Sequence, residues 1–254
     1  KIGFNNYSGG IAASGGTLSN LNALIAARHN AGLGSDPRSV LLVSEDAHSS
    51  FIKCIRIMGL DDNNLIRVKT DNKGCMDIKC LRKTLDNCSI ENKKIFAVVA
   101  TLGTTVRGAI DPIKDISEIC KERNIWLHID GSIGGIFTVT SIPIEGINNI
   151  DQANSITINP QKIIGITKTS SLLLVSNMST LENTFSTGLP YISSKVNIIN
   201  RGELGIQGSR PAEVIKLWLG LRFLGMKGIE DILKSSINRK NFFIKNINKN
   251  KYDI

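Results

Sequence analysis

The chain has 254 residues, of which 41% are hydrophobic and 21% charged, which suits one large α/β domain or two small ones. This composition excludes an intrinsically disordered chain, and the sequence has no apolar run of the roughly 20 residues that span a membrane. The net charge is +9, yet no run of Lys or Arg exceeds two residues and aromatic residues make up only 5%, which disfavours nucleic-acid binding. We therefore expect a soluble, cytoplasmic protein without a nucleic-acid or membrane partner.

Neither a disulfide framework nor a metal site is expected. The five cysteines form no CxxC pair, and their odd number argues against systematic pairing. Only three histidines are present, which makes a zinc site improbable.

Segments with the periodicity of helices and of strands alternate along the chain. Residues 17–32 carry apolar side chains at helical spacing, and Gly32 provides a stop signal. Residues 95–103 are continuously apolar, which is typical of a strand buried on both faces. The other predicted strands are 39–45, 64–70, 125–130, 155–159 and 170–176, and the other predicted helices are 48–60, 76–88, 112–124 and 209–249, the last interrupted near 225–228.

This alternation predicts the α/β class, with a mostly parallel sheet covered by helices on both faces in a three-layer α/β/α sandwich. Only a short loop joins strands 155–159 and 170–176, so that pair is predicted to be antiparallel. We expect residues 1–225 to form one domain and residues 226–254 to form a helix that leads toward a small C-terminal domain outside this chain. An N-terminal segment is likewise expected to be missing.

The loop ASGGTLSN, residues 13–20, is a candidate anion site. Its two glycines let backbone N–H groups approach a ligand, Thr17 offers a hydroxyl or a helix cap, and a helix N-terminus favours an anion. A simple N-capped turn would have the same pattern.

Two further loops follow predicted strands. In SEDAHSS, His48 is either a turn residue without a role or a flat ring that stacks on an aromatic ligand. In ATLGTTVRGAID, Gly103 is followed by Thr104 and Thr105, which offer two hydroxyls at the end of an apolar strand.

The stretch WLHIDGSIGG places the carboxylate of Asp130 at the end of a buried strand. Burying a carboxylate is costly unless a cation pairs with it. A helix cap or a structural salt bridge would also explain Asp130, and His128 on the same side of the strand is expected to belong to the core.

SITINPQK places Lys162 just beyond another buried strand, where ligands of open α/β sheets bind. A lysine in a pocket can form a Schiff base with a carbonyl compound, although a lone lysine is usually only solvated. Pyridoxal 5'-phosphate (PLP) requires an anion site, a flat ring to stack on, hydroxyls, a buried acid and an amine. The five loops above together offer this set, and we call the anion site at residues 13–20 the anion cradle.

The sequence also resembles the PLP-dependent group II amino-acid decarboxylases of the type I aminotransferase fold, which include the aromatic-amino-acid and glutamate decarboxylases. The resemblance runs from about residue 9 to about residue 228. The stretches that carry it, in order, are SGGTLSNLNALIAAR, SEDAHSSFIKCIRIMGL, ATLGTTVRGAIDPI, IWLHIDGSIGG, SITINPQK and QGSRPAEVIKLWLGLRFLG.

The resemblance implies a role for each matching position. Gly16, Thr17, Asn159 and Gln161 would hold the cofactor phosphate, and His48 would stack on the pyridine ring near the substrate carboxylate. Thr105 would lie near the ring hydroxyl, Asp130 would pair with the pyridine nitrogen, and Lys162 would form the Schiff base. Ser209 would reach the phosphate of a neighbouring subunit, which implies a homodimer with its active site at the interface.

Three positions depart from the family pattern. Gln161 stands where the family usually has histidine, and Ser132 stands where it usually has alanine, so a hydroxyl would face the ring. The aromatic decarboxylases also carry a proton-donating tyrosine on a loop after the lysine. The nearest tyrosine here is Tyr191, and Asn200 or Arg201 aligns with the catalytic one, which leaves the final proton donor unassigned.

The expected activity is PLP-dependent decarboxylation of an L-amino acid to its amine and carbon dioxide. Catalysis would rest on Lys162, His48 and Asp130. Two alternatives are a PLP-dependent carbon–carbon lyase similar to sphingosine-phosphate lyase, because GSRP also resembles that branch, and a non-catalytic, dimer-forming homologue. The sequence does not indicate which amino acid is the substrate. Arg107 and Arg210 could meet an acidic one, but a surface or interface salt bridge is the more common role for either.

Overall fold

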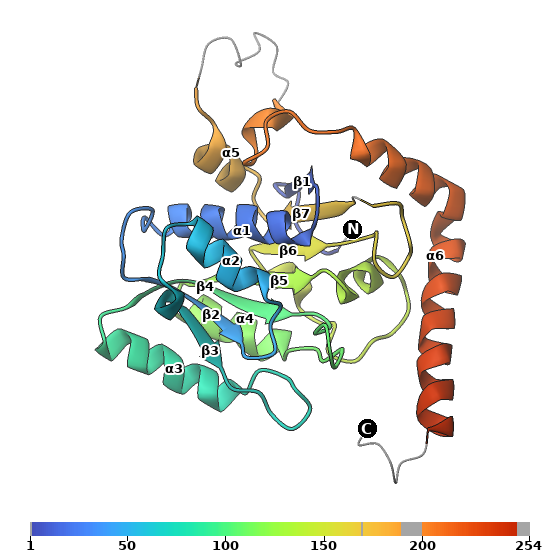
Figure 1. Cartoon of the computed structure of the whole chain (residues 1–254), viewed down its shortest axis with the longest axis horizontal. Helices are drawn as coiled ribbons and strands as arrows, with labels where there is room; N and C mark the ends of the chain where they lie inside the picture. Colours follow the sequence, from blue (N-terminus) through green and yellow to red (C-terminus); the bar gives the residue numbers. More distant parts are fainter. Residues whose placement is uncertain (1, 169, 189–199, 248–254) are drawn as a thin grey trace.

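A central sheet organises the protein. The computed structural model describes residues 2–168, 170–188 and 200–247, and within them seven strands form one sheet in the order β1-β7-β6-β5-β4-β2-β3 (Figure 1). The pairs from β6 to β3 are parallel, whereas β7 pairs antiparallel with both β6 and β1. The strands are β1 Gly9–Ala13, β2 Ser39–Ser44, β3 Leu65–Val68, β4 Lys94–Thr101, β5 Trp126–Gly131, β6 Ser155–Ile158 and β7 Ser171–Val175.

Helices cover both faces of this sheet, and the side chains of β4 show why. Ala97 and Val99 pack into a core shared with α1 and α2, whereas Val98 and Ala100 pack into a second core on the side of α3 and α4. Successive side chains of a strand point to opposite faces, so a continuously apolar strand supplies both cores. The helices are α1 Gly16–Asn30, α2 Ser50–Ile57, α3 Ile78–Ile90, α4 Ile113–Glu122, α5 Ser179–Phe185 and α6 Glu213–Asn246.

The predicted three-layer α/β/α architecture is therefore confirmed, and so is the antiparallel pairing of β6 with β7. Two elements, β1 and α5, were not predicted. The β1 sequence GGIAA contains two glycines and lacks a strand-like pattern, and it becomes a strand because it pairs along β7. Helix α5 has only seven residues and packs Leu181 into a small core with β7 and α1.

Helix α6 differs in detail from its prediction. It begins at Glu213 rather than 209, just after Pro211, and it ends at Asn246. Gly225 inside it has φ 61° and ψ 177°, a conformation open to glycine, which produces the kink that the sequence placed near 225–228. The helix runs along one side of the molecule (Figure 1).

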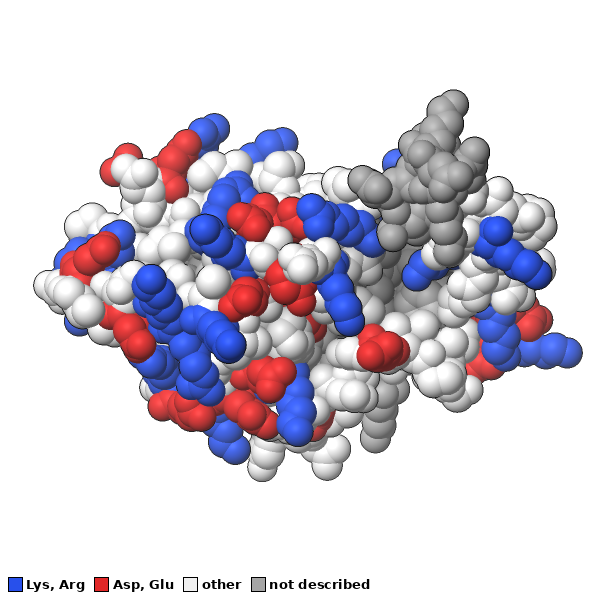
Figure 2. All heavy atoms as spheres, turned by 90° about the horizontal axis from the view of Figure 1, so that it is seen from below, with Lys and Arg blue, Asp and Glu red and all other residues white. Residues whose placement is uncertain are grey.

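Charges are mixed on the face shown in Figure 2, where Lys and Arg side chains are interspersed with Asp and Glu. The ion pairs of the described residues include Arg56 with Asp62 and Arg82 with Glu122. None of the described helices combines the length and apolarity needed to cross a membrane. The cellular location stays a prediction.

A buried acid fixes the end of β4. Asp111 accepts hydrogen bonds from the backbone N–H groups of Met76 and Thr101, at 2.7 Å each, and is fully buried. It thereby ties the segment before α3 to the residue that ends β4. Burial raises the pKa of Asp111 to about 6 in spite of these two donors.

We predict that Asp111→Ala lowers the free energy of unfolding by about 2–4 kcal/mol, because two buried N–H groups lose their acceptor. The folded protein retains the Asp111 proton up to about pH 6, whereas an unfolded aspartate releases it near pH 4. The stability contributed by this proton is therefore present at low pH and is lost as the pH rises from about 4 to about 6. Urea unfolding across this range should show the largest cost of the variant at low pH, and the exposed Asp115→Ala is the control.

Candidate active site

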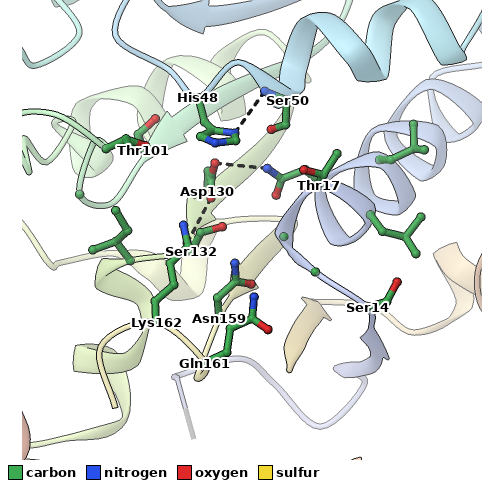
Figure 3. A pocket seen from close by; sticks show the side chains of 18 of the residues that line it. Ser14, Thr17, His48, Ser50, Thr101, Asp130, Ser132, Asn159, Gln161 and Lys162 are labelled. Atoms are coloured by element: carbon green, nitrogen blue, oxygen red, sulfur yellow. Dashed lines mark hydrogen bonds between the residues drawn. The ribbon is translucent and has the colours of Figure 1, made fainter. Parts of the chain in front are cut away.

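The turn after β6 carries the lysine. Pro160 follows Asn159, and the backbone N–H of Lys162 donates to the carbonyl oxygen of Asn159 at 3.0 Å, which closes a β-turn. The turn directs the Lys162 side chain into a cavity of about 510 Å³ at the carboxyl ends of β4, β5 and β6 (Figure 3). Within the described part of the chain, Lys162 forms no ion pair.

One end of the cavity gathers hydrogen-bond donors around Gly16. A Cβ atom on Gly16 would lie 2.6 Å from Nδ2 of Asn159 and 2.9 Å from the Oγ of Ser132, so a larger residue would displace these two polar groups. Ser171 donates to Oδ1 of Asn159 at 2.5 Å, and its hydroxyl oxygen lies 2.7 Å from that of Ser19. Because the carbonyl of the Asn159 amide is already bonded, its NH2 group is left for a ligand.

The Gln161 amide is arranged in the same way as that of Asn159. Its Oε1 accepts from the backbone N–H of Ser170 at 2.6 Å, which leaves its NH2 group free to donate. The N-terminus of α1 adds backbone donors, since no side chain caps it and its first turn has no acidic residue. Thr17 is therefore not the helix cap; Gly15 holds that position, and Thr17 lies inside the helix with its side chain at the cavity.

The buried acid lies at the other end. Asp130 is only 4% exposed, and it accepts hydrogen bonds from the backbone N–H of Ser132 at 3.1 Å and from Nδ2 of Asn20 at 3.2 Å. No Lys, Arg or His pairs with it among the described residues. The salt bridge considered from the sequence is thus not formed, and a cationic N–H of a ligand would supply the missing partner.

His48 lies on the loop between β2 and α2 and lines the cavity. The backbone N–H of Ser50 donates to its Nδ1 at 3.1 Å, so the neutral ring carries its proton on Nε2. Two buried hydroxyls that line the same cavity, those of Ser50 and Thr101, have no hydrogen-bond partner. Buried polar groups are normally satisfied, so these two indicate a polar ligand.

Nine of the ten residues predicted for the site line this one cavity. Ser209 does not; it is exposed and lies outside the cavity of its own chain. Ser50, Thr101 and Asn20 also line the cavity and were not predicted. Asn20 follows Gly16 by one helical turn, so its spacing could have indicated it. The nine residues are Gly16, Thr17, His48, Thr105, Asp130, Ser132, Asn159, Gln161 and Lys162.

The residues considered for the final proton donor lie elsewhere. Tyr191 falls outside the described residues. Asn200 accepts from the backbone N–H of Gly202, and Arg201 donates to the carbonyl oxygen of Gly10, so neither side chain lines the cavity.

The two arginines named for an acidic substrate are engaged elsewhere. Arg107 pairs with Asp46 at 3.3 Å, and Arg210 donates to the backbone carbonyl groups of Ala12, Arg201 and Gln207. Neither lines the cavity.

The arrangement fits PLP. The donors around Gly16 match the phosphate of that cofactor, and the carboxylate of Asp130 matches its ring nitrogen. The unpartnered hydroxyls match the ring hydroxyl, and the amine of Lys162 matches the aldehyde. The fold and this site together define a PLP-binding protein of the type I fold.

Comparison with known proteins gives the family. The sequence model of the pyridoxal-dependent decarboxylase conserved domain matches residues 2–253, and the chain therefore belongs to that family. It is 30% identical to an aromatic-L-amino-acid decarboxylase of Bacillus atrophaeus over 93% of this chain and 50% of that protein. It is 32% identical to the acidic amino acid decarboxylase GADL1 of Xenopus tropicalis over 94% of this chain and 49% of that protein.

The fold agrees with this assignment. The crystal structure of mouse CSAD in apo form superposes with a TM-score of 0.88 at 27% identity, over 99% of this chain and 54% of that one. The chain thus spans about half the length of the relatives that it matches.

We predict that Gly16→Ala weakens PLP binding about tenfold or more, because the new Cβ displaces the Asn159 amide from its bond with Ser171. Titration of the protein with PLP, followed by absorbance, measures the dissociation constant. Gly34→Ala is the matched control, since a Cβ there meets nothing within 4 Å. Unchanged PLP affinity in Gly16→Ala would contradict the anion cradle.

Proposed function

We propose that the protein uses PLP to decarboxylate an L-amino acid to its amine and carbon dioxide. The observation that carries the proposal is the convergence, in one cavity, of an anion cradle, a buried carboxylate without an ion pair, and Lys162. Membership of the pyridoxal-dependent decarboxylase family supports it.

Each side chain has a defined task in this proposal. Gly16, Thr17, Asn159 and Gln161 bind the cofactor phosphate through N–H groups and a hydroxyl. Asp130 accepts the N–H of the pyridine ring and keeps it positively charged. The remaining contacts are His48 on the ring face, Thr105 and Ser132 at the ring, and Lys162 at the aldehyde.

When bound, PLP supplies the electron sink that takes up the electrons left by the departing carbon dioxide. The protein contributes position and proton control. Lys162 would hold the cofactor through its amine and would give up that position to the amino group of the substrate. His48, with its proton on Nε2, presents a donor to the substrate carboxylate.

The assembly is part of the proposal. The active site of the proposed homodimer lies at the subunit interface, and Ser209 contacts the phosphate held by the other subunit. The exposure of Ser209 outside the cavity of its own chain is compatible with this role.

We predict that Lys162→Ala abolishes amine formation, because no other lysine lines the cavity among the described residues. Borohydride reduction of the wild-type protein with PLP, followed by peptide mass spectrometry, should place a pyridoxyl group on Lys162. Lys168→Ala, an exposed lysine six residues further on, is the control and should retain both adduct and activity. Amine formation by Lys162→Ala, or adducts scattered over surface lysines, would refute the role.

We predict that Asp130→Ala still binds some PLP but loses nearly all activity, because the ring nitrogen loses its anionic partner. Carbon dioxide release and PLP content, measured on the same preparation, separate the two effects. Wild-type rates in this variant would refute the pairing. An amino-acid panel scored for carbon dioxide against aldehyde products distinguishes decarboxylation from carbon–carbon bond cleavage.

A further inference from the structure

A line of buried polar side chains runs away from the cavity beneath Asp130. Trp126, His128 and Asp130 alternate along β5 and so point to the same face of the sheet, toward α1. Ser155 lies beside His128 in the register of β5 and β6, and Asn20 of α1 lies between His128 and Asp130. All five residues are buried, and the proposed function uses only Asp130.

The hydrogen bonds along this line have a single consistent direction. The indole N–H of Trp126 can only donate, and it donates to the Ser155 hydroxyl at 2.9 Å. The hydroxyl proton of Ser155 is then available to Nδ1 of His128, 2.8 Å away.

The remaining bonds follow from this first one. With Nδ1 acting as the acceptor, the His128 proton resides on Nε2, which lies 3.1 Å from Oδ1 of Asn20. The Asn20 amide then donates through Nδ2 to Oδ2 of Asp130 at 3.2 Å. Each group donates toward Asp130, so the series ends on an acceptor.

The reverse direction leaves one buried group unsatisfied. It requires a protonated Asp130, an Asn20 amide turned around, and a His128 proton on Nδ1. Ser155 would then accept from both Trp126 and His128, and among the described residues its own proton would have no partner in this fully buried position. Such an orphaned donor is costly, and the fixed direction of the indole N–H therefore selects the first arrangement.

We propose that Trp126, Ser155, His128 and Asn20 are positioning residues that form a one-way series of donors and thereby hold Asp130 as an acceptor for a cationic N–H in the cavity. This inference rests on the proposed function only in naming the pyridine N–H of PLP as that ligand. The direction of the series is a property of the protein alone.

The groups around Asp130 indicate that the donors of this series carry no charge. Burial lowers the pKa of His128 to about 4, against the opposing effects of the Asp130 charge and of a backbone hydrogen bond at Ser155, so its ring is neutral at physiological pH. Burial, together with the Asp130 charge, raises the pKa of the Cys54 thiol on α2 to about 12. Of the described residues, the other titratable groups that line the cavity next to Asp130 are His48 and Lys162.

The first test uses the wild-type chain without PLP. Nitrogen-15 NMR of its histidines at pH 7 reports the tautomer of each ring, and His29→Gln and His48→Gln identify the other two signals. We expect His128 to carry its proton on Nε2. A proton on Nδ1 would overturn the inference whether or not the protein binds PLP.

The second test uses two hydroxyls on the same strand. Ser155→Ala removes one member of the series, whereas Thr157→Val removes a buried hydroxyl beside Asp130 that has no hydrogen-bond partner. We expect Ser155→Ala to give a mixture of His128 tautomers. We also expect about tenfold weaker PLP binding, because the series of donors that supports the charged Asp130 is broken. Thr157→Val should keep the wild-type tautomer and bind PLP within about twofold of the wild type.

Trp126→Phe provides a second variant that keeps Ser155 and an aromatic ring but removes the group that sets the direction. It should also mix the His128 tautomers, and this outcome does not depend on whether Ser155→Ala folds. An unchanged tautomer in Trp126→Phe, or equal loss of PLP affinity in Ser155→Ala and Thr157→Val, would overturn the inference. Failure of the wild type to bind PLP, with the Nε2 tautomer present, would instead count against the proposed function alone.

Discussion

The site depends on the burial of one carboxylate at the edge of a parallel sheet. Asp130 is almost inaccessible, and each of its oxygens needs a donor there. The backbone of Ser132 serves one oxygen, and Asn20 serves the other. Asn20 can reach it only because α1 begins close to the sheet, and Gly16 permits that approach beside Asn159. Helix α1 thus contributes residues to both ends of the cavity.

Strand order explains why so many functional side chains meet. The neighbouring parallel strands β4, β5 and β6 end at the same edge, which brings Thr101, Asp130 and Asn159 together. The antiparallel return of β7 then places Ser171 against the Asn159 amide. The mixed sheet therefore contributes to the proposed phosphate site as well as to stability, since its one reversed strand orients the Asn159 amide.

The amine of Lys162 and the carboxylate of Asp130 lie in different surroundings within the cavity. The lysine amine lies at the end of a turn open to solvent, whereas the carboxylate lies deep and is supported by neutral donors. His128 stays neutral because burial disfavours its charged form, so it adds no positive charge that would compete with a ligand for Asp130. No Lys, Arg or His of the described residues pairs with Asp130, which leaves this carboxylate available to a positively charged ligand.

The sequence by itself determined the α/β class and most strand and helix positions, because apolar periodicity is a local signal. The residues that follow buried strands, together with the family resemblance, indicated nine of the residues around the cavity. The tertiary structure decided three features: strand β1, the hydrogen bonds of Asn20 and Ser171, and the ion pair of Arg107 with Asp46. Their partners lie far apart in the chain, and an ordinary Asn, Ser or Arg carries no local mark of what it will meet. Periodicity indicates which face a side chain takes, whereas only packing decides its neighbour.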